Sequence, residues 1–470
     1  MVNVSEQYLR VIKTGILYLS FLSLGLCIAA PGPTLLDLQH IVHTKTSYIT
    51  YIYLGRSAGY LFGSLIGGII IDQWKKEIPA LLIFNLITAI GVFFIPWSRQ
   101  VEVLITIMAI SGLSMGALDT GGNVWCLNLW KNNNGPYMQA LHFLFGVGAF
   151  ISPLIIAPFL SQQQNVSTLN TTDSNGLKEN STDHNLIPSI TYAYGILGII
   201  SFIVTMMFIF LLFVSSSEEL QEDHKNINNG KRQDRSLSIT FIFFTILLLS
   251  VYAGIEIGYA QMLSTFAVKS HLQLSKETAS YMTSVFWATF TFGRGLAILL
   301  AVKIRPFMLI IVDFVFMVIS SSLLLPISLG NKHEILLWTG TAVLGLSLAS
   351  FYPSTISWAE NHVNISNKVA SLFVIAASLG ETVVPLTVSQ YVDKKPQVLL
   401  YIVMISVVLC GALIFILWLL TFWLGNKHDI EENLEIQLSA SSNLVEIQEQ
   451  IQDNNAEQES EVTNLNHSRI

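Results

Sequence analysis

The chain is poor in charged residues and in cysteine. Charged side chains make up 12% of its 470 residues, against roughly 25% in an average soluble protein. Three cysteines (Cys27, Cys126 and Cys410) lie within or beside apolar runs, which leaves no disulfide framework. The sequence has no nucleotide-binding loop, no His/Cys metal cluster and no nucleophile motif in a polar segment. These absences argue against an enzyme, a cofactor and a nucleic-acid partner.

Long apolar runs dominate what is present, and hydrophobic residues make up 52% of the chain. A run of about 17–25 apolar residues crosses a bilayer as a helix, because lipid offers the backbone no other hydrogen-bond partner. No small-residue cleavage site follows the first run, so we interpret it as an uncleaved span. We predict an all-α membrane protein with twelve transmembrane helices near 14–36, 49–71, 79–97, 102–124, 138–160, 188–214, 237–266, 280–302, 306–328, 335–357, 367–391 and 397–424.

The two halves of the chain repeat each other. Residues 112–125 match residues 345–358 at an offset of 233, the Gly-x-x-x-x-Pro segments at 148 and 380 match at 232, and the Phe-Gly pairs at 62 and 292 match at 230. We therefore predict two pseudo-symmetric six-helix bundles, residues 1–214 and 237–425, joined by a cytoplasmic linker at 215–236. Such a duplication is typical of a transporter with its substrate site between the halves.

Basic residues and glycosylation sequons predict the orientation. With both termini inside, inner segments hold fourteen lysines and arginines and outer loops hold eight, as the positive-inside rule expects. Three sequons, at Asn165, Asn170 and Asn180, fall in the predicted outer loop after the fifth span, where glycosylation takes place. We expect a multi-pass glycoprotein of the plasma membrane, with the apical surface as one candidate location.

The C-terminal tail, residues 426–470, has ten acidic and two basic residues. This composition predicts a disordered cytoplasmic segment. A short amphipathic stretch around Leu444, Ile447 and Ile451 is a candidate contact for a cytosolic partner. The membrane body is close to neutral, and a monomer is the default for this architecture.

Ionisable residues inside the predicted spans are the first candidates for a site, because a charge in the membrane is retained where it meets a partner or a wet cavity. Asp119 and Asn123 are four residues apart and share a helix face. A carboxylate and an amide on one face can hold sugar hydroxyls or a small cation. The alternative is a fixed hydrogen bond between helices. The full set is Arg56, Asp119, His142, Glu256, Arg294, Asp313 and Glu381.

Two further carboxylates are candidates for ion coupling. Glu256 lies between Tyr252 and Tyr259 at −4 and +3, which suits a polyol, or it forms an ion pair with Arg294. Glu381 lies four residues before Pro385, and a proline in a span frees a carbonyl and bends the helix. Glu381 is thus a candidate ion ligand, or alternatively a structural partner of Arg294.

The remaining candidates are polar or aromatic groups. Gln139 and His142 share a face, and a neutral histidine can bond a sugar while a protonated one can carry a proton. Trp287 offers a flat face on which a pyranose ring can stack. Arg56, in the outer half of the second span, is a candidate gate cation, with a snorkelling arginine as the alternative. Asp313 is expected to be structural.

Several segments resemble a known family. Residues 68–76, with Gly68, Asp72 and Lys76, resemble the signature between helices two and three of the major facilitator superfamily, although Gln73 and Lys75 depart from it. Residues 32–34, 55–61, 118–124, 138–143 and 377–381 resemble the sodium-dependent glucose transporter branch, also called major facilitator superfamily domain-containing protein 4. This branch is similar to the fucose permease type of carrier. The resemblance implies sodium-coupled uptake of glucose or a related hexose, with a gating role for Asp72.

We therefore expect a secondary active transporter that works by alternating access, with sugar and sodium as substrates. Sodium would bind carboxylates chosen from Asp119, Glu256 and Glu381. The alternatives are a proton-coupled carrier, a passive pathway for sugar or another small neutral solute such as urea, and a transporter-shaped receptor that signals through its tail.

Overall fold

The computed structural model describes residues 4–74, 77–130, 134–161, 188–215, 235–301, 303–363 and 367–424, and its regular elements in these ranges are helices. The three predicted glycosylation sites, most of the linker and the tail lie outside the described residues. The first half contains α1 (Val4–Ala29), α2 (Pro31–Ile41), α3 (Thr46–Ile49), α4 (Tyr51–Trp74), α5 (Glu77–Phe94), η1 (Ile95–Trp97), α6 (Val101–Trp130), α7 (Asn134–Ile156), η3 (Ala157–Phe159) and α8 (Ile190–Ser215).

The second half contains α9 (Arg235–Ala253), the π-helical turn η5 (Gly254–Gly258), α10 (Tyr259–Lys269), α11 (Lys276–Ala301), α12 (Pro306–Ser328), α13 (Glu334–Leu348), α14 (Phe351–Glu360), α15 (Asn367–Tyr391) and α16 (Val398–Leu424). Each predicted span falls on a helix or on consecutive helices. The largest differences are at the first span, whose helix begins at Val4, and at the fourth, whose helix continues to Trp130. Both helices extend beyond the apolar run that predicted them.

The all-α membrane class is confirmed. Within the described residues, eleven helical segments are long and apolar enough to cross a membrane. The second predicted crossing, α4, is not among them, although its 24 residues are sufficient in length. Its sequence is rich in glycine and contains Arg56. The total of twelve crossings is consistent with this arrangement.

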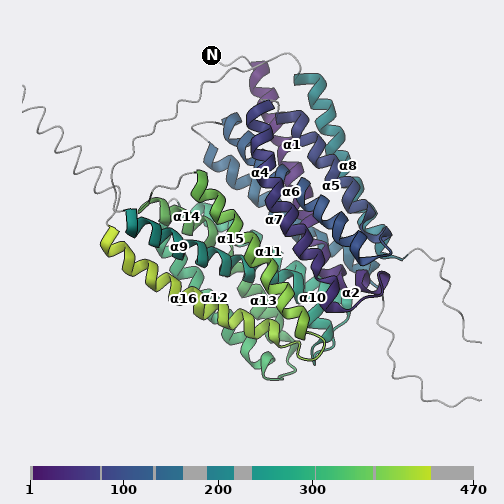
Figure 1. Cartoon of the computed structure of the whole chain (residues 1–470), viewed down its shortest axis with the longest axis vertical. Helices are drawn as coiled ribbons and strands as arrows, with labels where there is room; N and C mark the ends of the chain where they lie inside the picture. The colour runs from purple at the N-terminus through teal and green to yellow at the C-terminus, as the bar shows by residue number, and fades with distance from the viewer. Residues whose placement is uncertain are drawn as a thin grey trace, which may run out of the picture.

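The helices form two bundles that lie side by side (Figure 1). In the first bundle, α1 packs on α7, α4 on α6, and α5 on α8. In the second, α9 packs on α15, α11 on α13, and α12 on α13 and α16. The bundles contact each other through α7 and α11, α4 and α15, and α2 and α10.

A row of glycines brings α4 and α6 into backbone contact. Gly55, Gly59, Gly63 and Gly67 are spaced by four, so they lie on one face of α4. A Cβ atom on any of them would come closer than 3.0 Å to backbone atoms of α6, at Ile105, Ala109, Leu113 and Ala117 respectively. Small residues let membrane helices approach in this way. The stripe therefore fixes where α6, and with it Asp119, lies against α4.

Glycines from the repeated segments occupy matching places in the two bundles. Gly112 of α6 lies against the backbone of Arg56 in α4, and Gly345 of α13 lies against that of Phe286 in α11. Gly148 of α7 lies against Leu22 of α1 in the same manner. Its counterpart is Gly380 of α15, which contacts the backbone of Ser250 in α9. The sequence repeat thus corresponds to a repeat of helix packing.

The bundles meet at one end and diverge at the other. Figure 1 shows them close together around α2 and α10 and apart toward the end that holds the start of α1 and the start of α9. Polar contacts between bundles gather at the first end, hereafter the closed end. They include hydrogen bonds from Thr50 to Ser389 (2.8 Å), from Tyr53 to the carbonyl of Gln261 (3.4 Å) and from Ser280 to the carbonyl of Pro153 (2.8 Å).

Candidate functional site: a charged seam between the bundles

Asp119 lies on the side of α6 that packs against α4. Its Oδ2 accepts a hydrogen bond of 2.7 Å from the hydroxyl of Tyr60 in α4. Its Oδ1 accepts one of 3.3 Å from Nδ2 of Asn123, one turn later on α6. The predicted shared face of Asp119 and Asn123 is therefore present. Oδ1 of Asn123 is buried and has no hydrogen-bond partner among the described residues, so the cluster keeps one acceptor free.

Arg56 joins the two bundles. Its Nη2 lies 3.9 Å from Oε2 of Glu381 in α15, and its Nη1 donates to the carbonyl of Ile28 in α1 (3.1 Å). Arg56 is only 3% exposed, which excludes the snorkelling alternative. The expectation that Arg56 pairs with a carboxylate is met. The alternative pairing of Glu381 with Arg294 is wrong in this structure, because Arg294 contacts a different carboxylate.

Glu256 lies in the π-helical turn η5 and faces Arg294. Its Oε1 lies 3.8 Å from Nη2 of Arg294 in α11, and this guanidinium also lies 4.4 Å from the ring centroid of Phe290. Gly254 and Gly258, which bound the turn, pack tightly against α15 around Gly380 and Val384. Such π-turns inside α-helices are frequent at functional sites. The turn was not predicted, because a glutamate with a glycine two residues away on each side does not distinguish a π-turn from an ordinary helix in an apolar run.

The three carboxylates lie near one aromatic residue and near one another. Tyr352 of α14 lies close enough to Asp119, Glu256 and Glu381 to interact electrostatically with all three, and also with Arg294. Asp119 comes from the first bundle and the two glutamates from the second. The intramembrane acids therefore converge on the seam between the repeats.

His142 of α7 also belongs to this seam. It interacts electrostatically with Arg294 of the other bundle and contacts the ring of Phe21 edge-on, at 5.9 Å between centroids. On the next residue of α7, the Phe143 ring lies within van der Waals contact of a Cβ atom placed on Gly295 of α11. The first bundle thus supplies an imidazole at the level of the second bundle's arginine.

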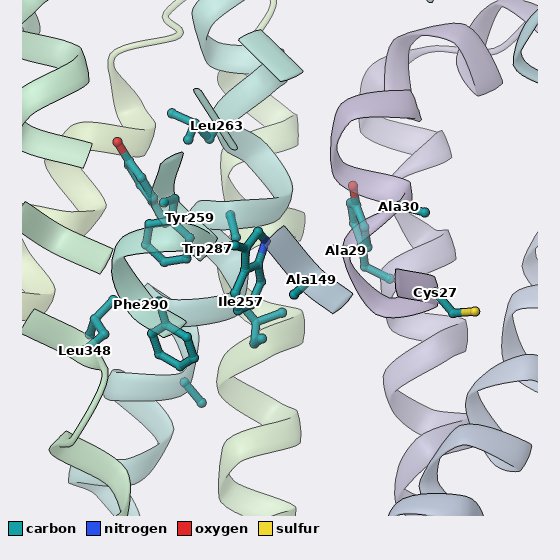
Figure 2. Packing of buried hydrophobic residues seen from close by; sticks show 14 of the residues in the cluster. Cys27, Ala29, Ala30, Ala149, Ile257, Tyr259, Leu263, Trp287, Phe290 and Leu348 are labelled. Carbon is teal, nitrogen blue, oxygen red and sulfur yellow. The ribbon is translucent and has the colours of Figure 1, made fainter. Parts of the chain in front are cut away.

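Trp287 and Gln261 carry buried polar atoms without partners among the described residues, Trp287 beside the π-turn and Gln261 nearer the closed end, where its carbonyl accepts from Tyr53. Figure 2 shows Trp287 beside Ile257, with Ala149 of the first bundle next to both. Its indole Nε1 is buried without a hydrogen-bond partner among the described residues, and the same holds for both amide atoms of Gln261. A buried polar group without a partner costs about 1–3 kcal/mol. These atoms are therefore ready to bind hydroxyl groups of a solute.

Of the other predicted site residues, Tyr252 lies near an acid of the seam, whereas Tyr259 and Gln139 do not contact one in the described part of the chain. Tyr252 interacts with Glu256, and its hydroxyl donates to the carbonyl of Leu348 (2.9 Å). Tyr259, after the π-turn, is not brought to Glu256: its hydroxyl bonds to Thr341 within the second bundle (2.7 Å). Gln139 is exposed near the start of α7, toward the diverging end. Asp72 lies in the last turn of α4, and its side chain is outside the described residues.

Sequence reasoning missed Tyr60, Tyr352 and Gln261. Tyr60 directly follows a glycine of the α4 stripe, and its bond to Asp119 depends on how these glycines align α4 with α6. Tyr352 and Gln261 sit in apolar runs with no local pattern to mark them. Asp313, as expected, is structural: it accepts a hydrogen bond of 2.5 Å from Ser350.

Two packed helical bundles with ionisable groups gathered between them define a membrane transporter rather than an enzyme. Comparison with known proteins gives the family. Residues 17–385 match the model of the Major Facilitator Superfamily, and the chain belongs to this family. The predicted family is thereby confirmed.

Similar proteins support the predicted branch. The chain is 34% identical to sodium-dependent glucose transporter 1 of Homo sapiens, over 94% of the chain and 86% of that protein. It is 27% identical to major facilitator superfamily domain-containing protein 4A of Homo sapiens, over 87% and 91%. Among solved structures, a variant of the E. coli fucose:proton symporter FucP superposes with a TM-score of 0.55 at 14% identity, over 87% of this chain and 99% of that one. The last likeness concerns the fold alone.

Proposed function

We propose that the protein is a sodium-coupled carrier for glucose or a related hexose, working by alternating access. The coarser statement, a membrane transporter of sugar type, follows from the family and its relatives. Sodium coupling and the hexose are the proposal. The observation that carries it is the convergence of three carboxylates on Tyr352 in the seam.

The charge of the seam favours a bound cation. Arg56 pairs with Glu381 and Arg294 pairs with Glu256. Asp119 has only neutral hydrogen-bond donors, Tyr60 and Asn123, within bonding distance among the described residues, and Arg294 acts on it from a longer range. Three carboxylates thus share two arginines, and a carboxylate without an ion-pair partner of its own is costly in a low-dielectric site. A small cation at Asp119 would remove this cost, and the unpartnered Oδ1 of Asn123 would add a second oxygen ligand.

The unpartnered polar atoms of Trp287 and Gln261 suit a sugar. Trp287 offers an N–H donor and an apolar ring face, and Gln261 offers a donor and an acceptor. Hexose hydroxyls both donate and accept, and a pyranose C–H face can stack on an indole. We assign His142 to the same solute-binding region, because it lies across the seam from Arg294.

Coupling requires that the cation bind one state better than the other. Arg56 and Glu381 belong to different bundles, so their distance changes when the bundles rock. With a cation at Asp119, the net negative charge around Tyr352 falls by one, which alters the balance of the ion pairs that hold the seam. Sodium occupancy thereby favours the state that closes over sugar.

The orientation belongs to the same proposal. The start of α1, the start of α9 and the end of α16 lie toward the diverging end in Figure 1, and the basic inner segments predict that this end is cytoplasmic. The closed end then faces outside, at the plasma membrane. Glycosidase treatment tests this assignment. We expect it to shift the gel mobility of the parent protein but not of the variant in which Asn165, Asn170 and Asn180 are replaced by Gln. The absence of a shift in the parent protein would refute glycosylation of this loop.

The test is Asp119→Asn, assayed as hexose uptake into vesicles with and without a sodium gradient at fixed pH. The change keeps the shape of the side chain. The side-chain oxygen of the new asparagine can still accept the hydrogen bond from Tyr60. If the Asn123 amide rotates, its free Oδ1 can accept a hydrogen bond from the new side-chain N–H. A hydrogen bond or contact to a charged group contributes about 1.5–3 kcal/mol, so we expect sodium affinity to fall by about tenfold or more.

Glu102→Gln serves as a control, because it removes a carboxylate charge from an exposed position on the same helix. Unchanged sodium-dependent uptake by Asp119→Asn at normal surface expression would remove Asp119 from the coupling site. Uptake that persists in choline but follows a pH gradient would favour the proton-coupled alternative. Linear, unsaturated flux would favour a passive pathway.

A further inference from the structure

A polar triad joins the bundles at the closed end. The Lys276 ammonium donates to Asp37 Oδ1 and to Ser161 Oγ (2.5 Å). Ser161 Oγ donates to the same oxygen of Asp37 (2.5 Å), and the Ser161 backbone N–H donates to Oδ2 (3.0 Å). Lysine, hydroxyl and carboxylate thus form a closed ring. Asp37 and Ser161 belong to the first bundle and Lys276 to the second.

A second triad at the same end has the same connections. The Lys269 ammonium donates to Asp393 Oδ1 and to Thr46 Oγ1 (2.6 Å). Thr46 Oγ1 donates to the same oxygen of Asp393 (2.9 Å). Here Lys269 and Asp393 belong to the second bundle, and Thr46 belongs to the first.

The internal repeat relates the two triads position by position. Asp37 and Lys269 are 232 residues apart, Thr46 and Lys276 are 230 apart, and Ser161 and Asp393 are 232 apart. Two of these offsets equal those of the repeated segments nearest to them, on the second and eighth spans (230) and on the fifth and eleventh (232). The third pair, Asp37 and Lys269, lies in α2 and α10, the helices that continue the first and seventh spans. The triads therefore occupy corresponding places in the two bundles, with the residue types exchanged among their three positions.

In both triads the residue that crosses between bundles begins a helix. Lys276 is the first residue of α11 and reaches α2 and the segment after η3. Thr46 is the first residue of α3 and reaches the end of α10 and the segment after α15. Opening the closed end must withdraw both residues.

We propose that Lys276 and Thr46 are a pair of unequal latches that hold this end closed. Withdrawing Lys276 separates an ion pair whose side chains are only 13% and 5% exposed. Withdrawing Thr46 breaks only the hydrogen bonds of its neutral hydroxyl to Lys269 and Asp393. The ion pair between Lys269 and Asp393 stays intact within the second bundle. Both residues make charge-assisted hydrogen bonds, but only the withdrawal of Lys276 also separates two opposite charges and gives up their Coulomb attraction. Lys276 is therefore the main latch and Thr46 the auxiliary one.

The experiment measures how often the closed end opens. Ile257 lies in the seam next to Trp287 and is 8% exposed (Figure 2). In an Ile257→Cys background, the rate of labelling by a membrane-impermeant thiol reagent reports access from the closed end. The reagent is applied to intact cells and to inside-out vesicles, so that either orientation is covered. The parent protein, with its three buried cysteines, gives the background rate.

Lys276→Met removes the charge of the main latch, and we expect it to raise the labelling rate from the closed-end side by about fivefold. For Thr46→Val we expect about twofold. Both factors lie within the range that the free energies of partly exposed polar pairs correspond to. Lys332→Met is the matched control, because Lys332 is an exposed lysine between α12 and α13 at the same end; its labelling should equal the parent's. Melting in detergent confirms that each variant is folded, and Lys276→Gln replaces any Lys276→Met protein that is not.

Charge reversal separates a latch from a general loosening. Asp37→Lys alone should label at least as fast as Lys276→Met, and combining it with Lys276→Asp should return the rate toward the parent's. The proposal is overturned if Lys276→Met labels like Lys332→Met, if Thr46→Val exceeds Lys276→Met, or if the reversed pair restores nothing. The readout involves neither hexose nor sodium, so failure of the proposed transport activity would leave it intact.

Discussion

The glycine stripe of α4 makes the most direct prediction about what holds the site together. In Gly59→Ala, the added methyl group would point at the backbone of α6, closer than 3.0 Å to the carbonyl oxygen of Ala109 and to the amide nitrogen of Leu113. Both are backbone atoms, so neither can move away by a change of rotamer, as a side chain could. The helices must separate, and Tyr60, the next residue on α4, would move away from Asp119.

The expected cost follows from packing. Overpacking a close contact costs about 1–3 kcal/mol, and the gain from replacing glycine by alanine in a helix is about 0.5–1 kcal/mol. The difference is a net loss of up to about 2.5 kcal/mol, and we expect the upper part of this range because the contact is with backbone atoms. We expect the melting temperature of the detergent-solubilised protein to fall by several degrees, and sodium-dependent uptake to fall with it as the bond between Tyr60 and Asp119 lengthens.

Gly195→Ala is the control for this prediction. Gly195 lies in α8, and a Cβ atom there would meet nothing within 4 Å, so this variant should be neutral or slightly stabilised by the same helix preference. If Gly59→Ala melts at the same temperature as Gly195→Ala, the close contact of α4 with α6 is not what positions Asp119, and the reasoning fails.

Two further predictions concern the seam. Glu381→Gln leaves the buried guanidinium of Arg56 without its ion-pair partner. Because the Glu381 side chain is 28% exposed, we expect the free energy of unfolding to fall by about 1–3 kcal/mol, less than the roughly 3–5 kcal/mol lost when a fully buried pair is broken. A melting temperature unchanged from the parent's would show that the pair contributes nothing. Trp287→Phe keeps an aromatic ring but removes the unpartnered N–H, so the KM for hexose should rise about threefold to tenfold, the equivalent of one neutral hydrogen bond. Trp418→Phe, on the exposed side of α16, should leave KM unchanged, and equal KM values for the two variants would exclude Trp287 as a sugar ligand.

Much of the fold could be predicted because it depends on local sequence. Every predicted span falls on helix, since the length and hydropathy of a run are enough to specify a membrane helix. The repeat at Gly112 and Gly345 correctly indicated equivalent packing. The π-turn around Glu256 could not be predicted, because it depends on the tight contact of Gly254 and Gly258 with α15.

The sequence predicted that the intramembrane acids lie together between the halves, and it predicted their pairings only partly. Asp119, Glu256, Glu381 and His142 do gather in the seam. The partner of Glu381 was ambiguous, since two arginines lie inside spans and sequence spacing cannot choose between helices that are far apart in the chain. The structure chooses Arg56. For Tyr259, an ideal helical register predicted a shared face with Glu256, and the π-turn instead leads its hydroxyl to Thr341.

The sequence by itself determined that this chain is a duplicated membrane bundle with acids buried in it, because apolar length, a repeated motif and the cost of a charge in lipid are properties of single segments. Only the tertiary structure decided which groups meet: Arg56 with Glu381, Tyr60 with Asp119, and Lys276 with Asp37. Each of these contacts joins helices distant in the chain, and their alignment is set by backbone-to-backbone packing at glycines. Such packing depends on the whole arrangement of helices rather than on any one of them.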